Sequence, residues 1–167
     1  MLNEAMQEAL NRQINAELGA FYTYLSMSAW FEYRDLRGFA AWMRRHADEE
    51  MTHATRILDY INERNGRVLL LPLDQPQIEW ESPLDVFQDA LKHEQHVTHL
   101  INDLVSLSSS EKDPASFSFL QWFVDEQVEE EALVDAAVQD LKLVGDFGPG
   151  LFLLDREMGA VQPEDGA

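Results

Sequence analysis

Four long segments of this chain repeat apolar residues every three or four positions, and each of the four series includes a glutamate. Steps of three and four are typical of a helix that buries one face. The segments span about residues 3–34, 38–66, 82–112 and 113–145. The chain is therefore expected to form four long helices, each of which carries an acidic side chain into the core.

Turn residues separate these segments and predict their arrangement. Typical helix starts and helix ends mark the boundaries: Ser82–Pro83, Asp113–Pro114, Gly66 and Gly145. Residues 66–81 contain two prolines and no helical period, so these 16 residues form a connection that can run back along a whole helix. We expect an all-α fold, a four-helix bundle of two antiparallel hairpins joined by a long crossover.

The C-terminal part of the chain adds a short element to this bundle. The segment "GPGLFLLDREMG" predicts a fifth helix, and residues 161–167 read as a polar tail. A length of 167 residues with 46% hydrophobic content suits one core, so residues 1–160 are expected to form a single domain.

Composition excludes several classes of function. The net charge of −19, from 31 acidic and 12 basic residues, argues against a nucleic-acid partner and favours cations as ligands. The absence of cysteine excludes disulfides, thiolate zinc sites and iron–sulfur centres. No apolar run approaches the roughly 20 residues that cross a membrane, and the first residues lack the features of a signal peptide. A cytoplasmic protein is expected.

Polar residues interrupt the apolar stripes at one depth of the predicted bundle. Seven residues are concerned: Glu17, His46, Glu50, His53, Glu94, Gln127 and Glu130. Adding 77 to the residue numbers of Glu17, Glu50 and His53 gives the positions of Glu94, Gln127 and Glu130. The spacing indicates a degenerate internal two-fold, in which each hairpin supplies half of one site.

Four buried carboxylates at one level need compensating charge. A polar layer neutralised by Arg or Lys is the simplest arrangement, but Arg44 and Arg45 lie off the stripe. Uncompensated burial costs several kcal/mol per ion or raises the carboxyl pKa values until protons are retained. Two divalent metal ions would balance the four negative charges. The Glu50-x-x-His53 pair, with its side chains on one helix face, is a candidate ligand pair.

The types of ligand narrow the choice of metal. Carboxylates with one imidazole and no sulfur favour iron or manganese over structural zinc. Di-iron and di-manganese bundles take one Glu from each of two helices and a Glu-x-x-His from each of the other two. The chain fits this pattern except in its fourth helix, where Gln127-x-x-Glu130 replaces the second Glu-x-x-His.

Five segments of the chain resemble the bacterial non-haem ferritins, and the resemblance covers about residues 1–160. These segments are "NAELGAFYTYLSMSAW", "RRHADEEMTHATRILDY", "KHEQ", "FSFLQWFVDEQVEEE" and "GPGLFLLDREM". The resemblance implies iron storage by a hollow shell of 24 subunits, which oxidises Fe(II) with O2 or H2O2 and retains a ferric mineral. Which oxidant is preferred stays open.

The same resemblance implies roles for the individual residues. It implies that Glu17, Glu50 and His53 form the first iron site and that Glu94 and Glu130 belong to the second. Glu50 would also bridge to the second site, and Gln127 would lie beside the second iron. It also implies a looser third site, close to Glu130, that consists of Glu49, Glu126 and Glu129. The alternative for these last three residues is a solvated acidic face. Because the second site lacks an imidazole, iron is expected to pass through it as a substrate.

Several neighbouring side chains have a structural and a functional interpretation. Tyr24 lies about one turn from Glu50 in depth and is either a core aromatic or an electron donor and hydrogen-bond partner at the centre, where the family has a tyrosine. His46 is expected in the core beside the centre, with a role as ligand as the alternative, and Trp122 is expected to pack there, with a role as redox neighbour as the alternative. The remaining histidines lie off the stripe and are expected at the surface or in an interface: His93, His96 and His99.

A haem group is not expected. Met51 belongs to a Glu-Met-x-His sequence that the haem-binding bacterioferritins share, but those proteins have a histidine where Glu130 stands. The apolar segments "VLLLPL" and "LFLL" instead predict contacts between copies of the chain, with folding back onto their own subunit as the alternative.

Two other classes of function remain open. One is a redox enzyme that keeps a permanent dimetal cofactor, such as a rubrerythrin-like peroxidase or an oxidase, although the lack of a cysteine pair argues against the rubrerythrin version. The other is a structural bundle with a static metal pair. Repeated turnover of iron distinguishes the ferritin interpretation from both.

Overall fold

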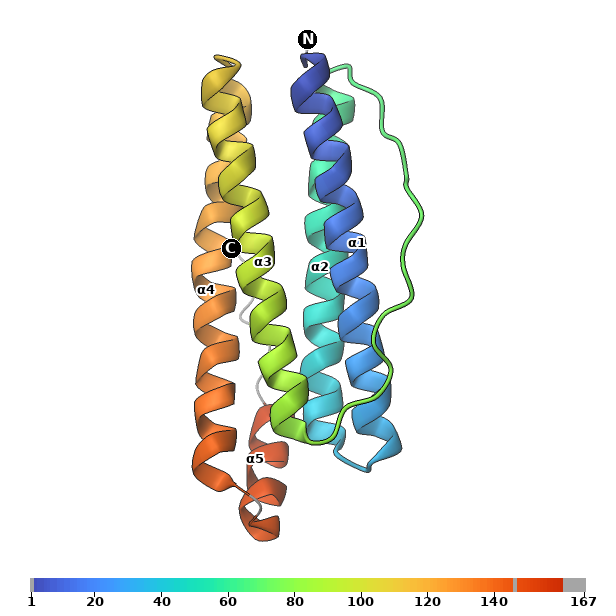
Figure 1. Cartoon of the computed structure of the whole chain (residues 1–167), viewed down its shortest axis with the longest axis vertical. Helices are drawn as coiled ribbons and strands as arrows, with labels where there is room; N and C mark the ends of the chain where they lie inside the picture. Colours follow the sequence, from blue (N-terminus) through green and yellow to red (C-terminus); the bar gives the residue numbers. More distant parts are fainter. Residues whose placement is uncertain (1, 146, 161–167) are drawn as a thin grey trace.

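Five helices make up the computed structural model, which describes residues 2–145 and 147–160. Their bounds are α1 Glu4–Tyr33, α2 Arg37–Glu63, α3 Pro83–Ser110, α4 Pro114–Val144 and α5 Gly148–Ala160. The helices α1 and α2 form one antiparallel hairpin and α3 and α4 another, with α5 across one end (Figure 1). This confirms the predicted all-α bundle. The predicted tail, residues 161–167, lies outside the described residues.

Capping residues begin three of the helices, and two of them, Ser82 and Asp113, were expected from the sequence. The side chains of Asn3, Ser82 and Asp113 accept hydrogen bonds from the backbone N–H three residues further on, at 2.8, 3.2 and 3.1 Å. These bonds satisfy N–H groups that have no partner within the helix. At the other end of α4, Gly145 has φ 55°, a conformation that favours glycine.

Two apolar clusters fill the bundle, one at each end. Aromatic side chains dominate the cluster near the α1–α2 turn, where Phe31, Phe39 and Phe87 pack against one another with ring centroids 5.3–5.8 Å apart. The opposite end holds mainly aliphatic side chains, among them Leu10 and Ile57. The polar level predicted from the sequence lies between the two clusters. None of the described helices is long and apolar enough to cross a membrane.

The crossover runs as an extended strap along the outside of α1 (Figure 1). Three amide side chains of α1, spaced by four residues, hydrogen-bond its backbone. Gln7 accepts from Arg67 N at 2.7 Å, and Asn11 donates to Arg67 O and accepts from Leu69 N at 3.0 and 2.7 Å. With its nitrogen toward the strap, Asn15 donates to Leu71 O at 3.1 Å. Side chains thus replace the hydrogen bonds that regular secondary structure would supply.

The two apolar segments expected at contacts remain largely exposed on the single subunit. Leu69, Leu70, Leu71 and Leu73 of the crossover are exposed, as are Phe152 and Leu153 of α5. Folding back onto the same subunit is therefore wrong for most of these side chains, while Leu154 does join the core.

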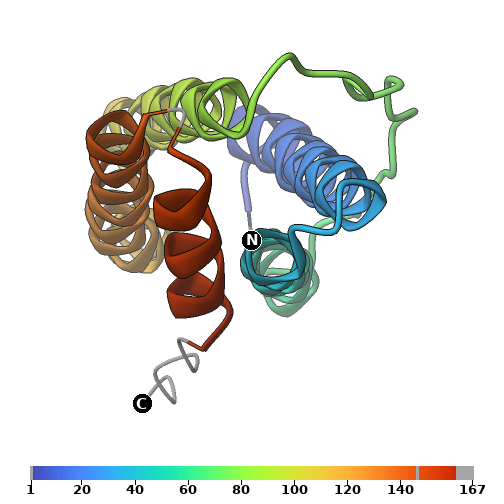
Figure 2. The same ribbon diagram turned by 90° about the horizontal axis from the view of Figure 1, so that it is seen from below.

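Helix α5 bridges the ends of α2 and α4 (Figure 2). Its Asp155 carboxylate accepts a hydrogen bond from Phe39 N at 2.8 Å, which supplies the cap that Leu36 cannot provide at the start of α2. The backbones cross closely, because a Cβ at Gly38 would lie 1.6 Å from the carbonyl oxygen of Asp155. A glycine at this position is therefore a condition for docking α5.

We predict that Gly38→Ala displaces α5 and destabilises the protein by about 1–3 kcal/mol, the usual cost of overpacking. Gly19→Ala is the matched control, because it also replaces a helical glycine and the added Cβ meets nothing within 4 Å. It should stabilise by roughly 0.5–1 kcal/mol. Thermal unfolding and hydrogen exchange of residues 148–160 measure both effects. Unchanged exchange of α5 in Gly38→Ala would contradict the close crossing.

Candidate metal centre

Six of the seven inward polar residues gather at the predicted level. They come from all four long helices and are at most 6% exposed: Glu17, Glu50, His53, Glu94, Gln127 and Glu130. The helical period thus placed these side chains correctly in the core. Their role as metal ligands stays a prediction at this point.

The first half of the centre joins α1 to α2. His53 Nδ1 lies 3.2 Å from Glu50 Oε2 and 4.0 Å from Glu17 Oε2, and ligand atoms of the three residues lie within 4.8 Å of one another. Gln13 donates to Glu17 Oε1 at 2.8 Å, whereas the buried Glu17 Oε2 has no hydrogen-bond partner. Two carboxylates and one imidazole with an unsatisfied oxygen between them are suited to a divalent cation.

The second half, from α3 and α4, has one fixed and one free carboxylate. Tyr24 donates a short hydrogen bond to Glu94 Oε1, and Gln127 Nε2 donates to Glu94 Oε2 at 3.2 Å. By contrast, Glu130 Oε2 is buried without a hydrogen-bond partner, although it lies 3.1 Å from His46 Nδ1. The fixed and the free carboxylate give this half a built-in asymmetry.

His46 is more closely involved than the sequence suggested. Its ring packs at a tilt on Trp42 and stacks on Tyr24, with centroids 3.7 and 5.5 Å away, as expected of a core residue. Its Nδ1, however, lies 3.2 Å from Glu49 Oε2, and the donors of His46, Glu49 and Glu130 all lie within 4.8 Å. The i, i+3 spacing of His46 and Glu49 was the signal that could have indicated this group.

The predicted third site is only partly assembled. Glu49 joins His46 and Glu130, but within the described ranges neither Glu126 nor Glu129 belongs to a group of three donors within 4.8 Å. Glu126 is half-buried and Glu129 is exposed. Both therefore lie on the open side of the centre.

Burial without a cation strongly affects ionisation at this level. Removal from water, reinforced by the neighbouring carboxylates, raises the pKa of Glu17 and of Glu50 well above the ordinary value. Burial likewise raises the pKa of Glu94 to about 7. Over residues 2–145 and 147–160, the only ion-pair partners of these glutamates and Glu130 are histidines. The metal-free centre therefore holds protons that a cation would displace.

Aromatic neighbours enclose the centre. The Tyr24 hydroxyl contacts Glu94, as its predicted depth suggested, and burial raises its pKa well above 10.0. Trp122 lies edge-on to His53 with centroids 5.4 Å apart, consistent with a packing role.

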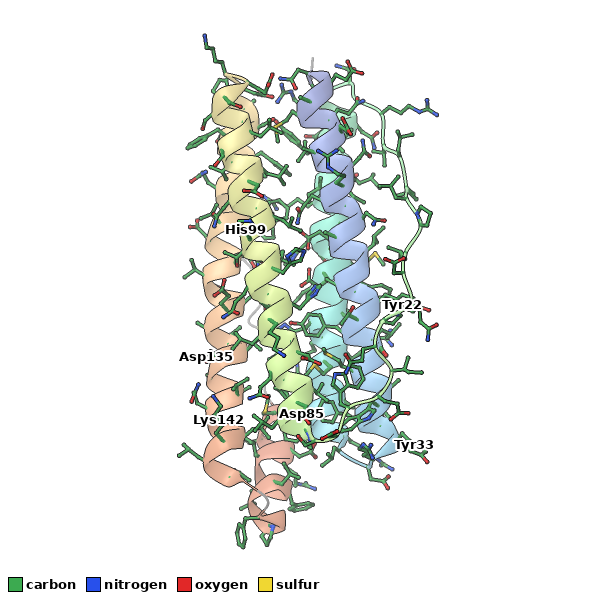
Figure 3. The ribbon with its side chains drawn as sticks, in the orientation of Figure 1. Tyr22, Tyr33, Asp85, His99, Asp135 and Lys142 are labelled. Atoms are coloured by element: carbon green, nitrogen blue, oxygen red, sulfur yellow. The ribbon has the colours of Figure 1, made fainter. Side chains whose placement is uncertain are left out.

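The surface prediction for the three off-stripe histidines is right for two of them. His96 and His99 are exposed, and Figure 3 labels His99 on α3. His93 is half-buried within the subunit, with a buried, unpartnered Nε2, and lies edge-on to Tyr24 at 6.4 Å, so the surface expectation is wrong for it and the interface alternative stays a prediction. Burial lowers the pKa of His93 to about 4, so its ring is neutral.

Comparisons with known proteins agree with this arrangement. The family model of the ferritin-like domain matches residues 7–144. A bacterial non-heme ferritin of Escherichia coli is 39% identical over 165 residues, which cover 99% of this chain and 100% of the relative. Another, from Campylobacter jejuni, is 44% identical over 156 residues, 93% of each chain.

Solved structures show the same fold. An open-pore ferritin from the hyperthermophilic archaeon Archaeoglobus fulgidus superposes with a TM-score of 0.95 at 46% identity, over 97% of this chain and 100% of that one. A closed form of that ferritin, engineered by site-directed mutagenesis, gives the same TM-score and identity, with 99% of that chain covered.

We predict that the metal-free protein loses stability as the pH rises from about 5 to about 8. The folded state keeps protons on the glutamates that the unfolded chain releases above about pH 4.5, so the free energy of unfolding falls until the folded pKa values are passed. For Glu94 alone the loss is roughly 3 kcal/mol, at about 1.4 kcal/mol per pKa unit.

Thermal unfolding midpoints of chelator-treated protein across this range measure the effect. Glu17→Gln provides the comparison, because subtracting its profile removes the contribution of surface charge. The variant should show a shallower decline and a higher midpoint near pH 8. Identical profiles for the two proteins would contradict the burial of an uncompensated charge at Glu17.

Proposed function

This chain belongs to the ferritin family, and from that premise we propose that it is an iron-storing ferroxidase, which oxidises Fe(II) with O2 or H2O2 and deposits the ferric product inside a protein shell. One observation carries the proposal. Four buried glutamates meet at one level without a Lys or Arg partner among the described residues, and two of their oxygens lack any hydrogen bond. Such a centre is complete only when cations enter it.

Two Fe(II) ions balance the four carboxylates. In this proposal Glu17, Glu50 and His53 bind the first ion, and Glu94 and Glu130 bind the second with Glu50 as a bridge. The unsatisfied oxygens of Glu17 and Glu130 support one ligand in each half. Loss of one electron from each iron leaves two excess positive charges, so oxide or hydroxide from water and oxidant must enter while protons leave. The product is then ready to hydrolyse and grow as mineral.

Glu130 offers a route by which iron leaves the centre. Its free oxygen lies near His46, whose Nδ1 also faces Glu49. Iron that leaves Glu94 can therefore stay on Glu130 while it passes to His46 and Glu49, and then to the half-exposed Glu126 and the exposed Glu129. This proposal adds His46 to the third site expected from the sequence.

The proposal includes a cytoplasmic shell of 24 subunits. The exposed leucines of the crossover and the exposed Phe152 and Leu153 of α5 support contacts between subunits. The solved relatives include a ferritin described by its open pore.

We predict that aerobic addition of Fe(II) gives a fast oxidation phase at about two irons per subunit, followed by continued uptake into a soluble particle, as the two proposed sites require. Glu50→Ala should slow the fast phase by about 10²-fold or more, because both sites lose a shared ligand. Asp48→Asn removes an exposed charge two positions away and should behave like the wild type.

Ferric absorbance and sedimentation provide the measurements. Stoichiometric binding without further turnover would contradict storage and favour a permanent dimetal cofactor. An unchanged fast phase in Glu50→Ala would contradict the bridging role.

A second variant tests the exit route. His46→Phe preserves the ring contacts with Trp42 and Tyr24 but removes the imidazole Nδ1. We predict a normal first addition of about two irons per subunit and a second addition slowed by about tenfold, since loss of one ligand costs roughly 10–100-fold in metal affinity. His99→Ala, an exposed site, is the control. Equal rates in repeated additions would exclude His46 from the route.

A further inference from the structure

A hydrogen-bonded chain leads from the second half of the centre toward the surface between α3 and α4. Gln127 Nε2 donates to Thr98 Oγ1 at 3.3 Å, and Thr98 Oγ1 donates to Glu131 Oε1 at 2.5 Å. Gln127 is buried, while Thr98 and Glu131 are half-buried. Neither Thr98 nor Glu131 belongs to the ligand set proposed above.

The chemistry of the three groups fixes the direction of this chain. An ionised carboxylate only accepts hydrogen bonds, so the Thr98 hydroxyl must donate its single proton to Glu131. The oxygen lone pairs of Thr98 are then left to accept from an N–H of Gln127. A carboxamide has two ends of nearly equal size, and its orientation is decided by the partners of each end. Glu131 thus acts on Gln127 through Thr98.

The other contacts of Gln127 agree with this orientation. Its Nε2 also lies 3.2 Å from Glu94 Oε2 and 3.3 Å from the backbone oxygen of Glu94. Three acceptors, at similar distances, therefore share two N–H groups, and all three favour the orientation in which Nε2 faces α3. No residue of the described chain donates to Gln127 Oε1. The amide oxygen remains available as a donor atom for a cation.

We propose that Thr98 and Glu131 are positioning residues of the second iron site, which hold the amide oxygen of Gln127 ready for the metal. The proposal rests on the iron-binding function inferred above. If the carboxamide of Gln127 flipped by a half-turn, its NH2 group would face the entering cation and the site would lose one oxygen ligand. The alternative is that the Thr98–Glu131 contact only joins α3 to α4.

Valine and serine at position 98 separate these two roles. Thr98→Val keeps the shape of the side chain and removes the hydroxyl, whereas Thr98→Ser keeps the hydroxyl and removes the methyl group. Anaerobic titration of the whole protein with Co(II), followed by its visible absorption, counts the two ions bound per subunit. We expect about tenfold weaker binding of the second ion in Thr98→Val, unchanged binding of the first, and wild-type behaviour in Thr98→Ser.

Glu131→Ala tests the outer end of the chain and replaces Thr98→Val if that variant does not fold. It should weaken the second ion in the same way. Asp135→Ala is its matched control, since Asp135 lies one turn further along α4 and is exposed (Figure 3). Within residues 2–145 and 147–160, its side chain hydrogen-bonds only Gln139. The control removes the same charge without touching Thr98.

Thermal unfolding of the metal-free variants completes the test. Weaker second-ion binding at an unchanged unfolding midpoint supports positioning. Wild-type Co(II) binding in both Thr98→Val and Glu131→Ala would overturn it, as would binding in Thr98→Ser as weak as in Thr98→Val. Failure of the wild type itself to bind two ions would overturn the iron-binding function as well, so the two failures are distinguishable.

Discussion

Repulsion between carboxylates is the constraint on which this bundle is built. Glu17, Glu50, Glu94 and Glu130 lie at one level, with apolar clusters above and below that exclude the water which would otherwise stabilise their charge. Protons relieve the repulsion in the metal-free protein, and the two divalent cations that we propose would relieve it in the loaded one. The rigid clusters keep the four helices from moving apart to relieve it in any third way. Affinity for cations therefore follows from the packing of the whole bundle.

The second half of the centre, from α3 and α4, contains two carboxylates of different freedom. Hydrogen bonds from Tyr24 and Gln127 fix both oxygens of Glu94, whereas Glu130 retains an unpartnered oxygen beside His46. A centre built to retain its metals would fix every ligand, because a fixed ligand need not be reorganised on binding. Here Glu94 is suited to holding iron and Glu130 to exchanging it. This division agrees with iron as a substrate that passes through the protein.

Sequence patterns predicted the parts of the structure that depend on local spacing. The helical period placed Glu17, Glu50 and Glu94 in the core, and Ser82 capped its helix as expected. Contacts between distant segments were not accessible in this way. Asp155 caps α2 from 116 residues away, and His93 is covered by Tyr24 of a different helix. The approach of His46 to Glu130 likewise depends on side-chain directions that spacing does not specify.

The strap along α1 is attached through neutral groups. Gln7, Asn11 and Asn15 bind its backbone by amide hydrogen bonds, none of which involves a side chain that titrates near neutral pH. Hydrolysis of ferric iron acidifies its surroundings, and salt weakens contacts between exposed charges. These three amide contacts with α1 respond to neither. The leucines on its outer side therefore keep their positions while the interior of the subunit gains and loses charge. The outer surface of the strap thus does not respond to the chemistry of the interior.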